Sequence, residues 1–140
     1  MLLIGALLAA VAAPAPPPRL PFSPAVHVHD MVYLSGEIGR KPGSMELVPG
    51  GMGPQAKQTM DNIAATLAAN RLSFADVVQC RVFLTDMSEW QDFNKIYVTY
   101  FPSGNYPARS ALGANGLALG AKVEVECMAH DPKADHQEGK

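Results

Sequence analysis

A chain of 140 residues with 48% hydrophobic and 17% charged side chains has the size and composition of one globular domain, which excludes disorder over most of its length. Its net charge of −2 provides no basic surface for a polyanion and argues against a nucleic-acid partner. The sequence contains no CxxC pair, HExxH motif or glycine-rich phosphate loop, so it indicates neither a metal nor a nucleotide cofactor.

The first twenty residues differ in composition from the rest. Residues 1–13 are apolar and end in small side chains, and a proline-rich stretch follows. This apolar run is too short to cross a bilayer but resembles the core of a secretory signal. No Lys or Arg precedes it, so an alanine-rich extension is the alternative. We expect a signal peptide and linker over 1–20, one domain over 21–130 and a polar tail over 131–140. Export to the periplasm follows, without membrane attachment once the signal is removed; a cytoplasmic location is the alternative.

The first half of the domain contains a strand pair, a loop and a helix. Two strand-like runs within residues 26–36 flank a polar pair at 29–30 and predict a hairpin. Residues 41–53 are rich in glycine and proline, which predicts a loop. A helix is predicted over 54–70, because proline suits a first helical turn and apolar residues recur at helical spacing after it.

The second half alternates strands and a helix. Residues 76–85 read as a strand, and a helix over 88–101 follows, with Ser88 as its N-cap. Two more strands are predicted over 108–114 and 122–129. In the strand over 76–85, period-two alternation assigns one face to Val78, Cys80, Val82 and Leu84.

Two cysteines, Cys80 and Cys127, lie within apolar strand-like runs. Such positions favour buried free thiols, and export would make a disulfide possible. The element order β-β-α-β-α-β-β indicates an α+β fold in which two helices cover one face of a sheet and the other face needs a partner, such as another subunit. The last strand supports this arrangement, since alternation turns Glu124 and Glu126 away from the helices.

Two residue types in this chain suit chemistry on a small carboxylate. The planar fork of Arg109 can bind a carboxylate through two hydrogen bonds; a surface arginine or an ion pair with Glu124 is the alternative. A glutamate on the last strand can act as a general base, although alternation alone does not separate Glu124 from Glu126. His27 and His29 alternate on one strand but lack a third ligand, so we assign no metal site.

Several tracts together carry a family resemblance. They include PFSPAV from Pro21, VYLSGEIG from Val32, PARSA from Pro107 and VEVECMA from Val123. Over residues 21–129 the chain resembles the Rid family of imine and enamine deaminases, also called the YjgF or L-PSP endoribonuclease family. The resemblance implies a chorismate-mutase-like α+β fold, a homotrimer with a central barrel, and active sites between subunits. It also implies cofactor-free hydrolysis of 2-aminoacrylate, 2-iminopropanoate, 2-iminobutanoate and related 2-imino acids to 2-keto acids and ammonia.

The same resemblance implies roles for individual residues. Arg109 falls on the position that binds the substrate carboxylate, and Glu124, rather than Glu126, falls on the position that activates water. Ser35 and Gly36 end the strand that borders the ligand. The remaining positions implied to contact substrate are Phe22, Asn94 and Ala111. Phe22 stands where well-known deaminases have an aromatic hydroxyl, so the ring is kept and a hydrogen bond is lost.

Two other functions remain as alternatives. Some members of the family are described as endoribonucleases, but the net charge and the lack of interleaved aromatic and basic residues argue against RNA here. A non-enzymatic trimer that binds small carboxylates, or acts as a chaperone, would need Arg109 but not Glu124.

Overall fold

The computed structural model describes residues 19–134. All but residues 19 and 20 of the predicted signal and linker segment, and most of the predicted tail, lie outside these described residues. The helices and strands run from Ala25 to His130, inside the predicted domain. No helix in the described part is long and apolar enough to cross a membrane.

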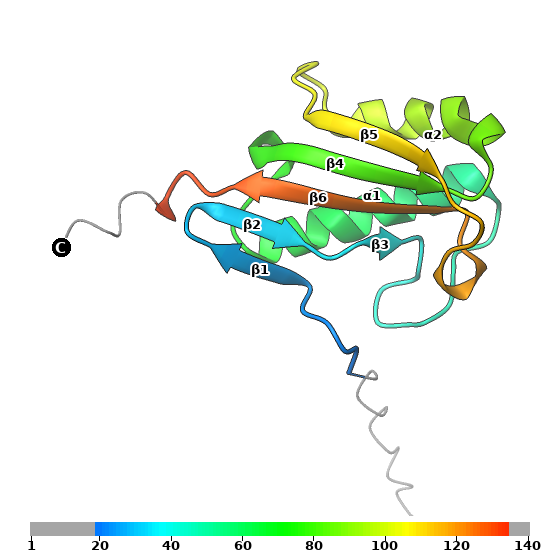
Figure 1. Ribbon diagram of the computed structural model, residues 1–140, viewed down its shortest axis with the longest axis horizontal. Coiled ribbons are helices and arrows are strands. Elements are labelled where there is room, and N and C mark those ends of the chain that lie inside the picture. Colours follow the sequence, from blue (N-terminus) through cyan, green and yellow to red (C-terminus); the bar gives the residue numbers. More distant parts are fainter. Residues whose placement is uncertain (1–18, 135–140) are drawn as a thin grey trace, which may run out of the picture.

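A single mixed sheet backed by two helices forms the fold. The strands follow the order β1-β2-β6-β4-β5, and β3 pairs with β6 beyond the end of β2. Only β4 and β5 run parallel among these pairs. Both helices lie behind the sheet in Figure 1, which confirms the predicted α+β class. The strands are β1 (Ala25–Val28), β2 (Met31–Leu34), β3 (Glu37–Ile38), β4 (Val77–Leu84), β5 (Ala108–Gly113) and β6 (Val123–His130), and the helices are α1 (Met52–Ala69) and α2 (Trp90–Tyr97).

The predicted hairpin is confirmed, and an additional short strand follows it. Val28 pairs with Met31 across a two-residue turn, in which His29 takes a positive φ of 53° in place of the usual glycine. The predicted order omitted β3, because two residues are too few to show a period.

Both helices differ from their predicted bounds. Helix α1 begins at Met52, so Pro54 still lies in its first turn. Helix α2 is shorter than predicted, because 3₁₀ turns at Met87–Glu89 and Val98–Tyr100 flank it. The predicted N-cap at Ser88 is wrong. The carboxylate of Asp86 accepts a hydrogen bond from the backbone N–H of Ser88 at 2.9 Å and caps the 3₁₀ turn that precedes α2, whose own N-cap position is Glu89.

A bulge in β4 breaks the predicted alternation. The register with β6 shifts between Val77 and Gln79, so Val77 turns into the core and Val78 is 43% exposed. An extra residue in one strand of a pair reverses the faces of the residues before it. After the bulge, Cys80, Val82 and Leu84 are buried as predicted.

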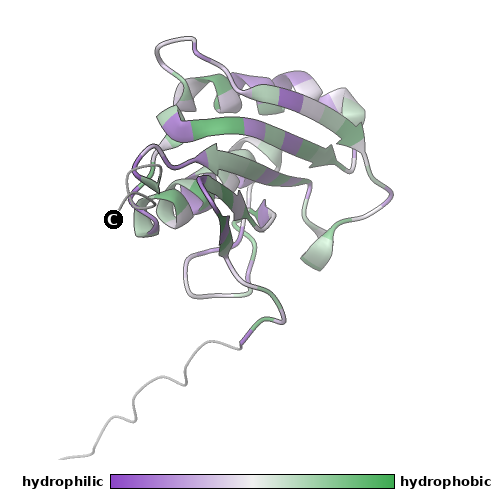
Figure 2. Ribbon diagram, turned by 60° about the vertical axis from the view of Figure 1, so that its left-hand side comes forward, coloured by the Kyte–Doolittle hydropathy of each residue, from purple (hydrophilic) through white to green (hydrophobic). Residues whose placement is uncertain are grey.

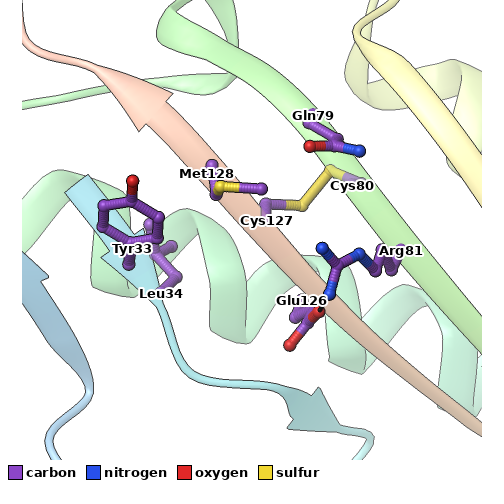
Figure 3. Close-up of a pocket in the computed structure, with 8 residues that line it drawn as sticks. All are labelled: Tyr33, Leu34, Gln79, Cys80, Arg81, Glu126, Cys127 and Met128. Atoms are coloured by element: carbon purple, nitrogen blue, oxygen red, sulfur yellow. Dashed lines mark hydrogen bonds and ion pairs between the residues drawn. A yellow bond between two sulfur atoms is a disulfide. The ribbon is translucent and has the colours of Figure 1, made fainter. Parts of the chain in front are cut away.

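The two cysteines form a disulfide, so the expectation of buried free thiols is wrong. Cys80 and Cys127 lie directly opposite each other on β4 and β6, with their Cα atoms 4.1 Å apart and their sulfurs bonded. Figure 3 shows this bond between the two strands. The sequence could not reveal the pairing, because it depends on the register of two strands far apart in the chain.

The two sheet faces have different environments. In β6, Val123, Val125, Cys127 and Ala129 are buried toward the helices, while the residues between them are half-exposed on the other face. Figure 2 shows hydrophobic and hydrophilic residues alternating along the strands. The face without helices also carries exposed apolar side chains, including Tyr33 and Leu112. This uncovered face could be buried by association with another subunit.

Candidate functional site

Arg109 lies on the helix-covered face of the sheet. The parallel register of β5 places it beside Cys80, whose side chain points toward the helices. Helix α2 then supplies two contacts one turn apart. The Nη1 of Arg109 donates a hydrogen bond to Oδ1 of Asn94 at 2.8 Å, and the guanidinium carbon lies 4.7 Å from the ring centroid of Tyr97. These contacts fix the guanidinium plane while leaving donors for a ligand.

The arginine pocket is a cavity of about 430 Å³ beside this guanidinium. Tyr97 is only 3% exposed, and its hydroxyl is buried without a hydrogen-bond partner among the described residues. Burial raises the pKa of Tyr97, while the charge of Arg109 acts in the opposite direction. Ala111 lies on the same face two residues beyond Arg109 and packs against the core. The residues that line the arginine pocket are Asn94, Tyr97, Val98, Tyr106, Pro107 and Arg109.

Glu124 lies on the uncovered face, at the start of β6, and borders a second cavity of about 280 Å³. We call this cavity the glutamate pocket. Its walls are mainly apolar. The residues that line it are Leu20, Phe22, Gly36, Glu37, Ile38, Arg40, Met45, Ala118, Leu119 and Glu124.

The carboxyl group of Glu124 rests directly on Gly36. A Cβ atom at residue 36 would overlap Oε1 of Glu124 and lie 3.1 Å from its Cδ, so only glycine leaves room for this position. No hydrogen bond or ion pair engages the Glu124 side chain within the described part of the chain. Burial raises the pKa of Glu124, and the nearby charge of Glu126 raises it further. A raised pKa brings the carboxylate closer to the range that a general base needs at neutral pH.

The structure separates Glu124 from Glu126. Glu126 forms an ion pair with Arg81, whose Nη1 lies 2.9 Å from its Oε1. Figure 3 shows this pair in a different hollow of the uncovered face, together with Tyr33 and Gln79. Glu126 therefore already has a cationic partner, whereas Glu124 is available to a ligand.

Of two other predicted site residues, one lines the glutamate pocket and the other supports it from outside. Phe22 lines it and is 55% exposed, so its ring can contact a ligand. Ser35 does not line it; its hydroxyl donates to the carbonyl of Ser23 at 2.6 Å, and its N–H donates to the carbonyl of Pro24 at 3.0 Å. Ser35 thus holds the segment that carries Phe22 against the sheet.

The two candidate catalytic side chains do not meet within one chain. Arg109 points toward the helices and Glu124 toward the uncovered face, and the pockets beside them have no residue in common. The alternative of an ion pair between Arg109 and Glu124 is therefore wrong for the single chain. A site that uses both residues on one small molecule requires a second copy of the chain.

Three residues near the pockets were missed by the sequence analysis. Tyr97 lies within the predicted helix over 88–101 but was not considered as a site residue, and neither were Glu37 and Arg40. Glu37 is 9% exposed, and its Oε2 lies 3.7 Å from Nε of Arg40. Burial raises the pKa of Glu37, with Arg40 acting in the opposite direction and Glu124 adding to the increase. The sequence did contain a signal for Glu37, because this acidic residue directly follows Gly36, the glycine that borders the predicted ligand site. Within the described residues, no group of His, Cys, Asp and Glu forms a metal site.

Comparison with known proteins places these features in context. A family profile described as "Endoribonuclease L-PSP" matches residues 12–131. The mouse protein named 2-iminobutanoate/2-iminopropanoate deaminase is 42% identical over 109 residues, which cover 78% of this chain and 80% of that protein. The crystal structure of RidA from an Antarctic Psychrobacter species matches with a TM-score of 0.76 and 39% identity, covering 83% of this chain and 93% of the other. The structure of E. coli TdcF with bound serine matches with a TM-score of 0.75 and 30% identity, covering 83% and 92%.

Proposed function

The chain belongs to the endoribonuclease L-PSP family, and we propose that it is a deaminase that hydrolyses small 2-imino acids to 2-keto acids and ammonia without a cofactor. Relatives named as deaminases support this activity, among them the mouse protein. The observation that carries the proposal is the pair of pockets described above. One presents a fixed arginine for a carboxylate, and the other presents an unpaired glutamate for a water molecule.

We propose that the active unit is a homotrimer whose active sites lie between subunits. Arg109 of one copy and Glu124 of the next would border the same site. The opposite faces on which these residues lie support this arrangement, as do the exposed Tyr33 and Leu112 on the uncovered face of the sheet. Closed cyclic assembly uses the same interface at every contact, so each copy supplies one half of two different sites.

The reaction follows from the groups present. Arg109 holds the substrate carboxylate through charge-assisted hydrogen bonds and so fixes the imine carbon beside the glutamate pocket. Glu124 takes a proton from water while the water oxygen bonds to the imine carbon; the π electrons of the C=N bond move to nitrogen, which gains a proton from solvent or from an acidic group of the site. Glu124 then returns its proton to the amino group of the carbinolamine, the C–N bond breaks, the hydroxyl loses its proton to solvent as it becomes the keto group, and ammonia leaves.

The pocket walls favour small substrates with apolar side chains. Phe22, Met45 and Leu119 provide apolar contacts beside Glu124. The loss of a hydroxyl at Phe22 leaves stacking as the contribution of that ring. The bound serine in TdcF shows that a member of the same family accommodates a small amino acid, which supports a small carboxylate as the ligand here.

We also propose that the protein is exported. The Cys80–Cys127 disulfide supports this location, because disulfides persist in oxidising compartments. Fractionation of cells that express the full chain, followed by mass measurement of its N-terminus, tests the proposal. Recovery of the uncleaved chain from the cytoplasm would contradict it.

The activity can be tested by trapping the imine. An amino-acid oxidase, with catalase present, generates 2-iminopropanoate from alanine, and semicarbazide captures the imine that remains. We expect the wild-type protein to reduce the captured fraction and to accelerate ammonia release, while Arg109→Ala and Glu124→Gln abolish both effects. No difference between wild-type protein and a buffer blank, across several amino acids, would refute the deaminase function.

The shared site has a sharper test. Arg109→Ala and Glu124→Gln subunits are each inactive alone, but a mixed trimer contains some sites with an intact arginine and an intact glutamate. Random mixing in equal amounts should restore about a quarter of the wild-type activity per subunit. A size measurement by light scattering checks the trimer itself. Failure of mixed trimers to recover any activity would place both groups in a single chain and contradict the shared site.

A further inference from the structure

Leu119 takes an unusual backbone conformation in the wall of the glutamate pocket. Its φ of 58° and ψ of 16° lie in the left-handed region, which residues with a Cβ atom rarely adopt. The other non-glycine residues with positive φ in the described part of the chain, His29 and Arg71, lie in the turns that follow β1 and α1. Leu119 instead lines a cavity and is 51% exposed. Backbone strain of this kind is typical of functional sites, where one side chain must be held in place.

Hydrogen bonds directly after Leu119 hold its turn against the body of the fold. The N–H of Ala121 donates to the carbonyl of Ala118 at 3.1 Å, and the side chain of Ala121 is buried. The N–H of the next residue, Lys122, donates to Oε1 of Gln55 on α1 at 2.9 Å. The turn is therefore fixed to α1, and its conformation keeps the Leu119 side chain at the pocket.

Other apolar side chains surround Glu124 in this pocket. Ile38 lies directly opposite Glu124 in the pairing of β3 with β6, and directly opposite residues share one face of a sheet. Phe22 and Met45 line the same cavity, and both are exposed, as is Leu119. Exposed large apolar side chains that gather around one cavity indicate a site for an apolar group of a ligand.

The remaining charged residues of the pocket offer little to a charged ligand group. Apart from Glu124, they are Glu37 and Arg40, and Nε of Arg40 lies 3.7 Å from Oε2 of Glu37. Each charge is therefore largely balanced by the other, so the pocket favours an apolar substrate side chain over a charged one.

The geometry of a 2-imino acid directs its side chain toward these apolar walls. Its reacting carbon is trigonal, so the carboxylate, the nitrogen and the side chain point in three directions within one plane. With the carboxylate on Arg109 of the neighbouring copy and the attacking water at Glu124, the side chain points away from the arginine. The cavity of about 280 Å³ is larger than the cavity of about 150 Å³ that can hold benzene, so a methyl group would fill little of it.

We propose that Leu119 is a specificity-determining residue that selects 2-imino acids with branched or aromatic apolar side chains over 2-iminopropanoate. This inference rests on the proposed deaminase function and names its preferred substrate class. Leu119 acts by contact with the substrate side chain and leaves the chemistry at the imine carbon unchanged. A single methylene group in an apolar pocket changes kcat/KM by about tenfold or more, so a side chain of four carbons should be clearly preferred to a methyl group.

Competition between 2-imino acids tests this preference in the full chain. An L-amino-acid oxidase, with catalase present, generates the imines of alanine, leucine, phenylalanine and glutamine, and semicarbazide captures the imine that remains. We expect kcat/KM for the leucine and phenylalanine imines to exceed that for the alanine imine by about tenfold or more. The glutamine imine, which has a polar side chain of similar length, should rank below the leucine imine.

Leu119→Asn separates the side chain from the backbone conformation. Asparagine adopts the left-handed conformation more readily than leucine, so the turn should persist and the melting temperature should not fall. The ratio of kcat/KM for the leucine and alanine imines should decrease about tenfold, because a polar group replaces an apolar wall. Leu119→Met keeps an apolar side chain and should retain the wild-type ratio.

A matched control lies in the same turn. Leu117 precedes the turn that contains Leu119 and does not line the pocket. Leu117→Asn makes the same chemical change two residues away, so it should leave the ratio of the leucine and alanine imines unchanged.

The outcomes distinguish this inference from the proposed function. A wild-type protein that hydrolyses none of the imines would refute the function itself. An active wild-type protein that prefers the alanine or glutamine imine would refute the substrate class alone. A Leu119→Asn variant that keeps the wild-type ratio would refute the role of Leu119. If Leu119→Asn fails to fold, Leu119→Gly removes the side chain and relieves the backbone strain. The same decrease in the ratio would then support the assignment, and an unchanged ratio would overturn it.

Discussion

Replacing Gly36 with alanine should disable Glu124 without unfolding the protein. The added methyl group would overlap Oε1 of Glu124 and lie 3.1 Å from Cδ and 3.3 Å from Cγ of the same side chain. Carbon atoms in favourable contact lie about 3.5–4.0 Å apart, so the carboxyl group must retreat by roughly half an ångström or more. The atoms that must move are the end of a flexible side chain, and a strained rotamer costs only about 0.5–1.5 kcal/mol.

The catalytic effect should be much larger than the effect on stability. A displacement of about 1 Å at a reacting group can lower a rate about a hundredfold. We therefore expect Gly36→Ala to reduce kcat/KM for 2-iminopropanoate by about that factor, while the free energy of unfolding changes by no more than the rotamer cost. Gly116→Ala is the matched control, because a Cβ there meets no atom within 4 Å and its φ is not positive.

Gly36 also borders the ligand, so a double-mutant cycle must separate its two effects. If alanine acts by displacing Glu124, adding Gly36→Ala to Glu124→Gln should lower the residual rate little further. An equal additional loss in that background would show that the methyl group blocks substrate instead. Gly36→Ala with the wild-type rate would refute the argument that the glycine positions the carboxylate.

Three further predictions concern other parts of the molecule. Arg109→Lys keeps a positive charge but loses the planar fork, so kcat/KM should fall about ten- to a hundredfold, the loss of one hydrogen bond to a charged group; an unchanged value would contradict carboxylate binding by the fork. Arg40→Gln removes the charge that lowers the pKa of Glu37, so titration of the Glu37 carboxyl followed by infrared or NMR spectroscopy should give a higher pKa than in the wild type, and a lower value would contradict the ion pair. Replacing both Cys80 and Cys127 with alanine removes a cross-link between residues 47 positions apart and should lower the free energy of unfolding by about 4 kcal/mol in the chain-entropy model. Denaturant titration of the wild type and the double variant at the same protein concentration measures this difference, and equal free energies of unfolding would contradict the prediction.

Alternation was enough to predict the inner and outer faces of β6. Val123 and Val125 are buried and Glu124 and Glu126 are half-exposed, because the period of a strand fixes the face of every residue once one is known. The same rule failed at Val78, since a bulge shifts the period by one residue without a glycine or proline to signal it. The disulfide was missed for a related reason: the pairing of Cys80 with Cys127 depends on register.

The candidate site could be predicted only as separate residues. Arg109 and Glu124 were identified from their chemistry and from the family resemblance, whereas their placement on opposite faces required the register of β5 with β4. Tyr97 was missed because a buried aromatic residue at helical spacing usually belongs to a core. Only the packing of α2 beside β5 brings its ring to the guanidinium.

In the proposed trimer, bringing Arg109 of one copy beside Glu124 of the next would complete the site and would also change the basicity of Glu124. In the single chain, burial raises the pKa of Glu124 and no cation in the described part engages it. In the proposed trimer the neighbour's arginine would lower that pKa, and further burial would raise it. Substrate alters this balance, because its carboxylate neutralises the guanidinium while the ligand displaces water from the pocket. Glu124 would therefore become a stronger base when the imine is bound, which is the state in which a proton must leave the attacking water.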